Sequence, residues 1–144
     1  MNATLKAFGY PDTCVQDYTN WAVLLRPKQA TLGALVLVEK SEATSYGDVS
    51  NEAMVEQKQV VADIEANLKV AFEAEKFNYL MLMMADPNVH FHVIPRYRTE
   101  RTFAGITFLD TGWPKLPDMT YSHNLESQVF SDLTQLLREG WLRL

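Results

Sequence analysis

The chain has 144 residues, of which 47% are hydrophobic, and its formal net charge is -5. This length can bury one substantial core but not two, so we expect a single domain over residues 1–144. The acidic balance argues against the broad basic surface that nucleic acids or anionic membranes require. We find no signal-peptide pattern and no apolar run long enough to cross a bilayer, and therefore expect no membrane partner and a cytoplasmic location.

The first half of the chain predicts two strands and a long helix. Residues 21–26 and 34–39 are short runs rich in Val and Leu, separated by a loop with proline and glycine, which is typical of a hairpin. In residues 51–76 apolar side chains recur at spacings of three, four or seven, and charged side chains fall between them. This period predicts an amphipathic helix, and Ser50 or Asn51 is suited to cap its first amides.

The second half predicts two more strands and a second helix. Residues 79–85 are apolar at every position, which predicts a strand covered on both faces or lying at a subunit interface. Residues 89–97 alternate in period two. Apolar positions between Leu125 and Leu137 predict an amphipathic helix that ends near Gly140. The order of elements predicts an α+β fold with an antiparallel sheet, a long amphipathic helix and a C-terminal helix.

Two histidines share one face of the strand predicted over residues 89–97. The β-carbons of His90 and His92 should lie roughly 6 to 7 Å apart, because a strand rises about 3.3 Å per residue. Imidazole titrates near neutrality, so one ring could attack phosphorus while the other donates to a phosphate oxygen. Arg96, Arg98 and Arg101 follow the pair closely and predict a locally positive site suited to a small anion.

A metal site is the main alternative for this histidine pair. His-x-His on a strand is also typical of one half of a zinc or iron site, which needs a third ligand. His123, Asp86 and Asp110 are the candidates, but no recognisable spacing ties any of them to the pair. The leading interpretation therefore uses no metal and no cofactor.

The segment Asn-Val-His-Phe-His-Val-Ile-Pro-Arg at residues 88–96 resembles the histidine-triad (HIT) signature. That signature is His-φ-His-φ-His-φ-φ, with φ apolar, and is commonly followed by Pro-Arg. Residues 21–27 and 31–38 resemble the first two strands of the same family. The resemblance implies an α+β sandwich that is usually a homodimer. It also implies hydrolysis or transfer of nucleotides at the α-phosphate through a nucleotidyl-histidine intermediate.

The resemblance assigns a role to each matching position. His90 takes the place of the nucleophile, and His92 that of the histidine that binds phosphate and assists the leaving group. Asn88 replaces the first histidine of the triad, which orients its neighbours through hydrogen bonds, a part that an amide can keep. Asn88 and Arg96 are predicted to bind substrate, with the arginine stabilising phosphoryl charge.

Two departures from the family pattern affect the predicted function. A glycine-rich segment that contacts phosphate in many members is shortened to residues 86–87, and positions that face the ribose correspond to Leu25 and Ala34. The leading hypothesis is a nucleotidyl hydrolase or transferase acting on a dinucleoside polyphosphate or nucleoside phosphoramidate. Asn88 and the short loop suggest the alternative of a nucleotide-binding protein with little catalysis, and a metal-dependent enzyme is the third hypothesis.

Overall fold

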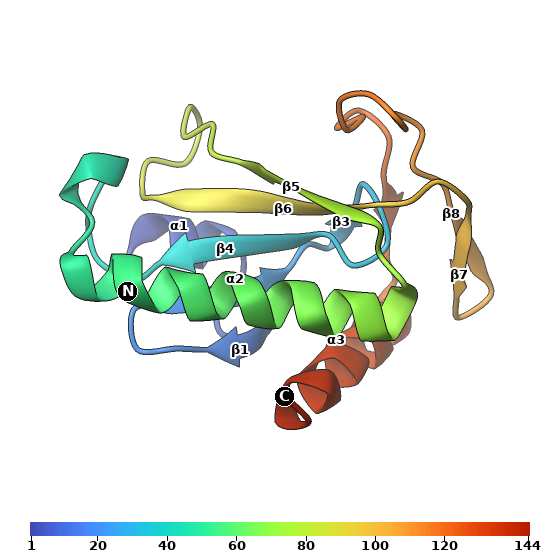
Figure 1. Cartoon of the computed structure of the whole chain (residues 1–144), viewed down its shortest axis with the longest axis horizontal. Coiled ribbons are helices and arrows are strands. Elements are labelled where there is room, and N and C mark those ends of the chain that lie inside the picture. The colour runs from blue at the N-terminus through green and yellow to red at the C-terminus, as the bar shows by residue number, and fades with distance from the viewer.

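Five antiparallel strands form the central sheet of the computed structural model, which describes all 144 residues (Figure 1). Their order across the sheet is β1-β2-β4-β6-β5. The strands span Cys14–Asp17 (β1), Trp21–Leu25 (β2), Leu35–Glu39 (β4), Lys76–Leu80 (β5) and His90–Arg96 (β6). Strand β6 pairs with β4 on one side and β5 on the other, so its side chains project from the interior of the sheet.

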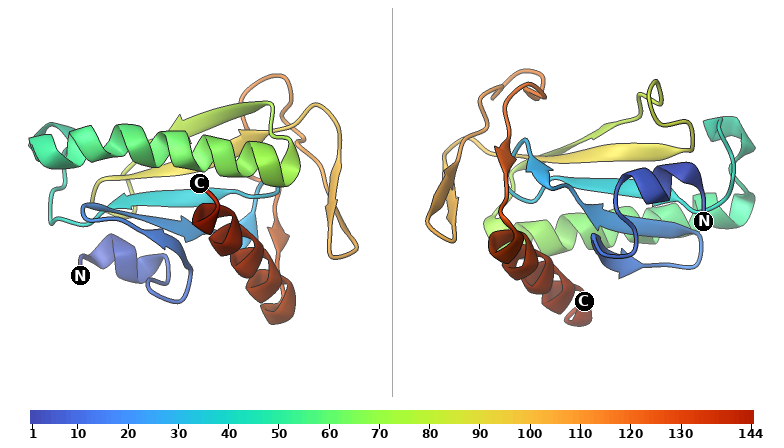
Figure 2. Two further views of the ribbon diagram at one scale, coloured as in Figure 1. Left: turned by 60° about the horizontal axis from the view of Figure 1, so that its bottom comes forward. Right: turned by 180° about the vertical axis from the view of Figure 1, so that it is seen from behind.

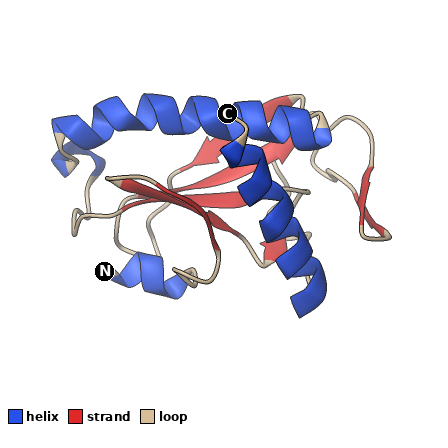
Figure 3. Ribbon diagram, turned by 90° about the horizontal axis from the view of Figure 1, so that it is seen from below, coloured by secondary structure: helices blue, strands red, loops and turns tan.

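Two helices, α2 (Asn51–Phe72) and α3 (Ser127–Leu142), lie on one face of this sheet (Figure 3). Helix α2 begins where the Ser50 hydroxyl accepts a hydrogen bond from the Ala53 amide, and it ends before Glu73, whose φ of 56° is left-handed. Both caps are local features, so the helix has fixed ends as well as an apolar stripe.

The main core fills the space between the sheet and these two helices. It includes Leu35 and Leu37 of β4, Ile64 and Leu68 of α2, and Leu133 and Leu137 of α3. The helices meet where the amide of Asn67 donates to the carbonyl of Leu137 at 3.0 Å. A β-carbon at Gly140 would lie 1.9 Å from the Asn67 side-chain oxygen, so only glycine leaves room for this contact.

The opposite face of the sheet is covered in part by the short N-terminal helix α1 (Ala3–Ala7), as Figure 2 shows from behind. The Asn2 side chain caps this helix by accepting from the Leu5 amide. Leu5 packs on apolar side chains of β2 and β4, with Phe8 beside it. Helix α1 is thus a small cover over a limited part of this face.

The remaining elements are short. Strands β3 (Lys28–Gln29) and β9 (His123–Asn124) pair with each other, as do β7 (Arg101–Phe103) and β8 (Ile106–Phe108). A single 3₁₀ turn, η1 (Tyr46–Asp48), precedes α2. None of the helices combines the length and the apolar composition needed to span a bilayer.

The α+β fold with an antiparallel sheet is confirmed, but some predicted boundaries are wrong. The long helix ends at Phe72 rather than at residue 76, because β5 begins there. The strand predicted over residues 79–85 is in fact β5, which pairs with β6 only as far as Leu80 opposite His92. Met83 then turns the backbone with a φ of 54°, and Met84 is 92% exposed. The C-terminal helix ends at Leu142, near Gly140 as predicted.

Candidate active site

Strand β6 presents both histidines on the face that α1 partly covers. His90 is paired with Val38 of β4 and His92 with Val36, and both valines belong to the apolar cluster beneath α1. The two imidazole centroids lie 5.3 Å apart, with an interplanar angle of 83°. The shared face predicted from the alternation is therefore confirmed, and one small group can contact both rings.

The main chain at Asn88 fixes the tautomer of His90. Nδ1 of His90 lies 2.7 Å from the Asn88 carbonyl oxygen, which can only accept, so Nδ1 carries the proton and donates it. The lone pair is then on Nε2, which has no protein partner. His90 is 2% exposed, and the ring of Phe8 packs against it with a centroid separation of 5.6 Å. The His90 ring thus presents an unprotonated nitrogen in largely apolar surroundings.

His92 is half-buried and uncharged at neutral pH. Its Nδ1 atom is the one enclosed side-chain polar atom of the protein that lacks a hydrogen-bond partner. Burial, followed by the charge of Arg26 and the neighbouring imidazole of His90, lowers the pKa of His92 to about 4, while the carboxylate of Asp86 acts in the opposite direction. A neutral imidazole can donate one hydrogen bond and accept another, so His92 is ready to contact a bound group.

Asn88 is turned toward helix α1. Its side-chain oxygen accepts from the Thr4 amide at 3.2 Å and from the Thr4 hydroxyl at 3.1 Å, and its amide nitrogen donates to the Glu42 carbonyl at 3.3 Å. The residue is 3% exposed. Asn88 therefore anchors the cover of the site with its side chain and orients His90 with its carbonyl. Direct contact with substrate would require breaking these side-chain bonds.

Sequence reasoning missed Arg26. Its amide donates to the Ala34 carbonyl at 3.2 Å, which continues the β2–β4 ladder by one residue beyond Leu25. Alternation along β2 then sends the Arg26 side chain to the histidine face, whereas Leu25 enters the main core. Of the two positions expected to face ribose, only Ala34 lies on the histidine face. The period-two pattern of residues 22, 24 and 26 could have revealed this.

Comparisons with known proteins identify the fold. No family model and no curated protein matches the chain. A histidine triad protein from Sinorhizobium meliloti 1021 matches 97% of this chain and 95% of its own with a TM-score of 0.75 at 17% identity. A histidine triad protein from Bradyrhizobium japonicum matches 96% of this chain and 95% of its own, with a TM-score of 0.72 at 18% identity. A hypothetical histidine triad nucleotide-binding protein from Sulfolobus tokodaii strain7 matches 92% and 85%, with a TM-score of 0.64 at 20% identity. The chain has the histidine-triad fold.

Arg96 has a structural place in this HIT fold. Its guanidinium donates to both carboxylate oxygens of Asp110, at 2.7 and 3.1 Å, and to the Asn78 side chain at 2.6 Å. The side chains of Arg96 and Asp110 are 5% and 1% exposed. Arg96 projects from the same face of β6 as His92, four residues farther on, but its donors are committed to this buried pair.

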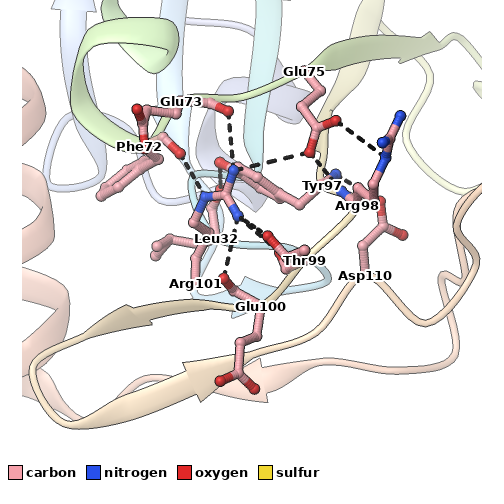
Figure 4. A network of polar contacts seen from close by, with 10 residues as sticks. All are labelled: Leu32, Phe72, Glu73, Glu75, Tyr97, Arg98, Thr99, Glu100, Arg101 and Asp110. Atoms are coloured by element: carbon pink, nitrogen blue, oxygen red, sulfur yellow. Dashed lines mark hydrogen bonds and ion pairs between the residues drawn. The ribbon is translucent and has the colours of Figure 1, made fainter.

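Arg101 and Arg98 belong to a second network, at the end of α2 (Figure 4). Arg101 donates to the carbonyl oxygens of Phe72 at 2.8 Å and Glu73 at 3.1 Å. Glu75 lies 3.9 Å from the guanidinium nitrogens of both arginines. The predicted positive exit beside the histidines is therefore not formed by Arg96 and Arg101, whose charges face internal partners. The cation that acts on His92 is Arg26.

The HIT fold does not bring a third metal ligand to the histidine pair. No group of three or more His, Cys, Asp or Glu side chains is placed to hold a metal ion. His123 lies on β9, where its ring contacts Phe108 and its Nε2 is 2.9 Å from the Tyr121 hydroxyl. Asp110 is occupied by Arg96. Of the three candidate ligands, Asp86 alone acts on the pKa of His92.

Proposed function

We propose that this protein is a nucleotidyl hydrolase or transferase that acts at the α-phosphate of a dinucleoside polyphosphate or nucleoside phosphoramidate, with His90 as nucleophile. The observation that carries the proposal is the 2.7 Å contact of His90 Nδ1 with the Asn88 carbonyl, which leaves the Nε2 lone pair free beside His92. A nucleotide is proposed because the structure from Sulfolobus tokodaii is described as nucleotide-binding.

The proposed reaction has two displacement steps. Nε2 of His90 attacks the α-phosphorus, and the bond from phosphorus to the leaving group breaks. His92 donates a hydrogen bond that stabilises the charge developing on the oxygens at phosphorus and on the leaving atom. Water then attacks the same phosphorus, gives up a proton, and breaks the bond to His90. Hydrolysis releases a nucleoside monophosphate, whereas another acceptor in place of water gives transfer.

The other groups of the site have supporting roles in this proposal. The Asn88 carbonyl holds the His90 ring in one tautomer and one orientation, which is what a buried partner does for a catalytic imidazole. Arg96 and Asp110 hold the far end of β6 in place. No metal or other cofactor takes part in the proposed steps.

A nucleotide-binding protein with little catalysis is the second candidate function. The observation that favours it is the packing of Phe8 over both histidines, with ring centroids 5.6 Å from His90 and 5.9 Å from His92. In-line attack requires the substrate phosphorus to approach Nε2 along an open path. If α1 and Phe8 stay in place when a nucleotide binds, the phosphate contacts the rings without reacting.

Rapid-quench trapping with a nucleotide labelled at the α-phosphorus tests the first candidate against the second. The wild-type protein should form an acid-labile, base-stable phosphoramidate. His90→Ala should form none and should lose at least about 1,000-fold in turnover. His123→Ala, which removes the histidine of β9, is the matched control and should label normally. Equal labelling of His90→Ala would contradict the proposal, and nucleotide binding without labelling of the wild type would favour the second candidate.

We also propose that the protein is one cytoplasmic domain that forms a symmetric homodimer. Strand β5 is at the edge of the sheet, and the segment after it exposes Leu82 by 59% and Met84 by 92%. Exposed apolar side chains beside an open edge suit pairing with a second copy. Light scattering at micromolar concentration should give twice the chain mass of 16.4 kDa. A mass equal to one chain would refute the dimer.

A further inference from the structure

Arg26 is a cation on the histidine face without an anionic partner. Its side chain leaves the sheet on the same side as Ala22 and Leu24. It lies beside Ala34, which packs against Ile94 of β6. The guanidinium makes no hydrogen bond or ion pair with any residue of the chain, in contrast to that of Arg96. Desolvation is the sole cause of the lowered pKa of Arg26, so no carboxylate offsets its burial.

An unpaired, half-buried guanidinium is costly in free energy. Removing a charge from water is unfavourable unless an opposite charge and hydrogen bonds compensate. Structural arginines in this protein meet that condition through Asp110, Glu75 and main-chain carbonyls. Arg26 does not, and a bound anion would supply what the protein itself leaves out.

A second unsatisfied group lies close to the first. Nδ1 of His92 is enclosed and has no partner, and the charge of Arg26 is near enough to act on His92. The register places Arg26 along this face, because Arg26 continues the β2–β4 pairing opposite Ala34, and Ala34 packs with Ile94, which follows His92 on the same face of β6. The proposed function places His92 toward the leaving group. Arg26 therefore lies on the leaving-group side of the pair, across His92 from the nucleophile His90.

We propose that Arg26, together with His92, binds a phosphate of the leaving group, so that the substrate is a phosphoanhydride of a nucleotide rather than a phosphoramidate with an amine leaving group. This inference rests on the proposed function and narrows its substrate class. When a phosphoanhydride is attacked, the bond to the bridging oxygen breaks and that oxygen gains negative charge on the departing phosphate. A guanidinium binds two phosphate oxygens at once and stabilises that charge. An amine leaving group takes up a proton and gains no negative charge.

Binding of inorganic pyrophosphate tests the anion site without relying on activity. Titration calorimetry should show that the wild type binds pyrophosphate and that Arg26→Gln raises the dissociation constant by at least about 10-fold, the usual effect of losing a charged hydrogen-bond donor. Lys28→Gln is the matched control, because it removes the same charge two residues away from an exposed side chain. Equal binding by Arg26→Gln and the wild type, or equal weakening by both substitutions, would overturn the inference.

Substrate selectivity tests the assignment to the leaving group. The ratio of kcat/KM for a dinucleoside tetraphosphate to that for a nucleoside 5′-phosphoramidate should favour the anhydride in the wild type. Arg26→Gln should reduce kcat/KM on the anhydride by on the order of 100-fold while changing that on the phosphoramidate only a few-fold. Arg26→Lys should recover part of the loss. A parallel loss on both substrates would overturn the leaving-group assignment.

These experiments separate failure of the inference from failure of the proposed function. A wild-type protein that traps label on His90 from the phosphoramidate, and whose selectivity is unchanged by Arg26→Gln, refutes the inference and keeps the nucleophile. A wild-type protein that traps no label from either substrate refutes the proposed catalysis, and pyrophosphate binding then shows independently whether Arg26 forms an anion site.

Discussion

The two faces of the sheet differ in how completely their polar groups are satisfied. On the face covered by α2 and α3, Trp21 donates its indole N–H to the Ala53 carbonyl at 2.7 Å and Asn67 bonds to Leu137. On the other face, a five-residue helix covers the histidines, and Arg26 and His92 Nδ1 have no protein partner. Buried polar groups are normally paired, so these two unpaired groups are the ones that the proposed anion would satisfy. Polar groups on the helix-covered face are thus satisfied within the chain, whereas the histidine face leaves two of them free for the proposed ligand.

The largest expected effect is a difference in unfolding free energy between two arginine-to-methionine variants, one at a paired arginine and one at an unpaired arginine. Arg96→Met leaves the Asp110 carboxylate buried without its cation, which should lower the free energy of unfolding by about 3–5 kcal/mol. Arg26→Met removes an unpaired cation and should leave that free energy unchanged or slightly higher. Urea denaturation measures both. Similar losses in the two variants would mean that Arg26 has a structural partner after all.

Loosening the small cover should have an intermediate effect. Asn88→Ala removes the acceptor for Thr4 and the donor to Glu42, leaving buried groups unpaired, and should cost about 1–3 kcal/mol of unfolding free energy. Hydrogen exchange of the α1 amides should speed up, while that of α2 should not. Asn124→Ala, at an exposed position, is the control. Unchanged exchange in α1 would show that Asn88 does not hold this helix.

The smallest effect should appear as a dependence of stability on pH. The pKa of His92 is about 4 in the folded protein and 6.5 without perturbation, so the unfolded chain binds more protons between these values. The contribution of His92 is therefore fully present above pH 6.5 and is lost as the pH falls toward 4. One proton limits the slope of the unfolding free energy against pH to about 1.4 kcal/mol per unit. Because His92 is partly solvated, the measured slope should be smaller than this limit. His92→Gln should flatten the curve between pH 6.5 and 5; a curve of unchanged slope would contradict the lowered pKa.

Patterns with a short period predicted the fold and the histidine pair well. Alternation along residues 89–97 was enough to place both imidazoles on one face, because a strand has a strict period of two. The end of β5 was not predictable in this way. Residues 81–85 are at least as apolar as the strand before them, yet pairing ends at Leu80 opposite His92, two residues short of the end of β6 at His90.

Charge near the site could not be assigned from the sequence. Arg96 is two residues beyond the signature and looked like a ligand for phosphate, yet Asp110, fourteen residues later, occupies it. Arg26 is separated from His92 by 66 positions in the chain, and the two share one face of the sheet only because β2 and β6 both pair with β4. Whether an arginine is free depends on which carboxylates the tertiary fold brings near, and local patterns do not contain that information.

The bond between Thr4 and Asn88 also constrains how this site could have changed over evolutionary time. Asn88 bonds to Thr4 through both its side chain and its main chain. Its side-chain oxygen accepts from the Thr4 hydroxyl, and its main-chain N–H donates to that hydroxyl at 3.0 Å. A neutral histidine at position 88 has a single acceptor nitrogen, so it could keep at most one of the two bonds that the Asn88 side-chain oxygen now accepts. Substitutions at positions 4 and 88 should therefore be coupled. Among close relatives of this chain, a full triad should occur with a residue other than threonine at position 4, and asparagine should occur with a hydroxyl there.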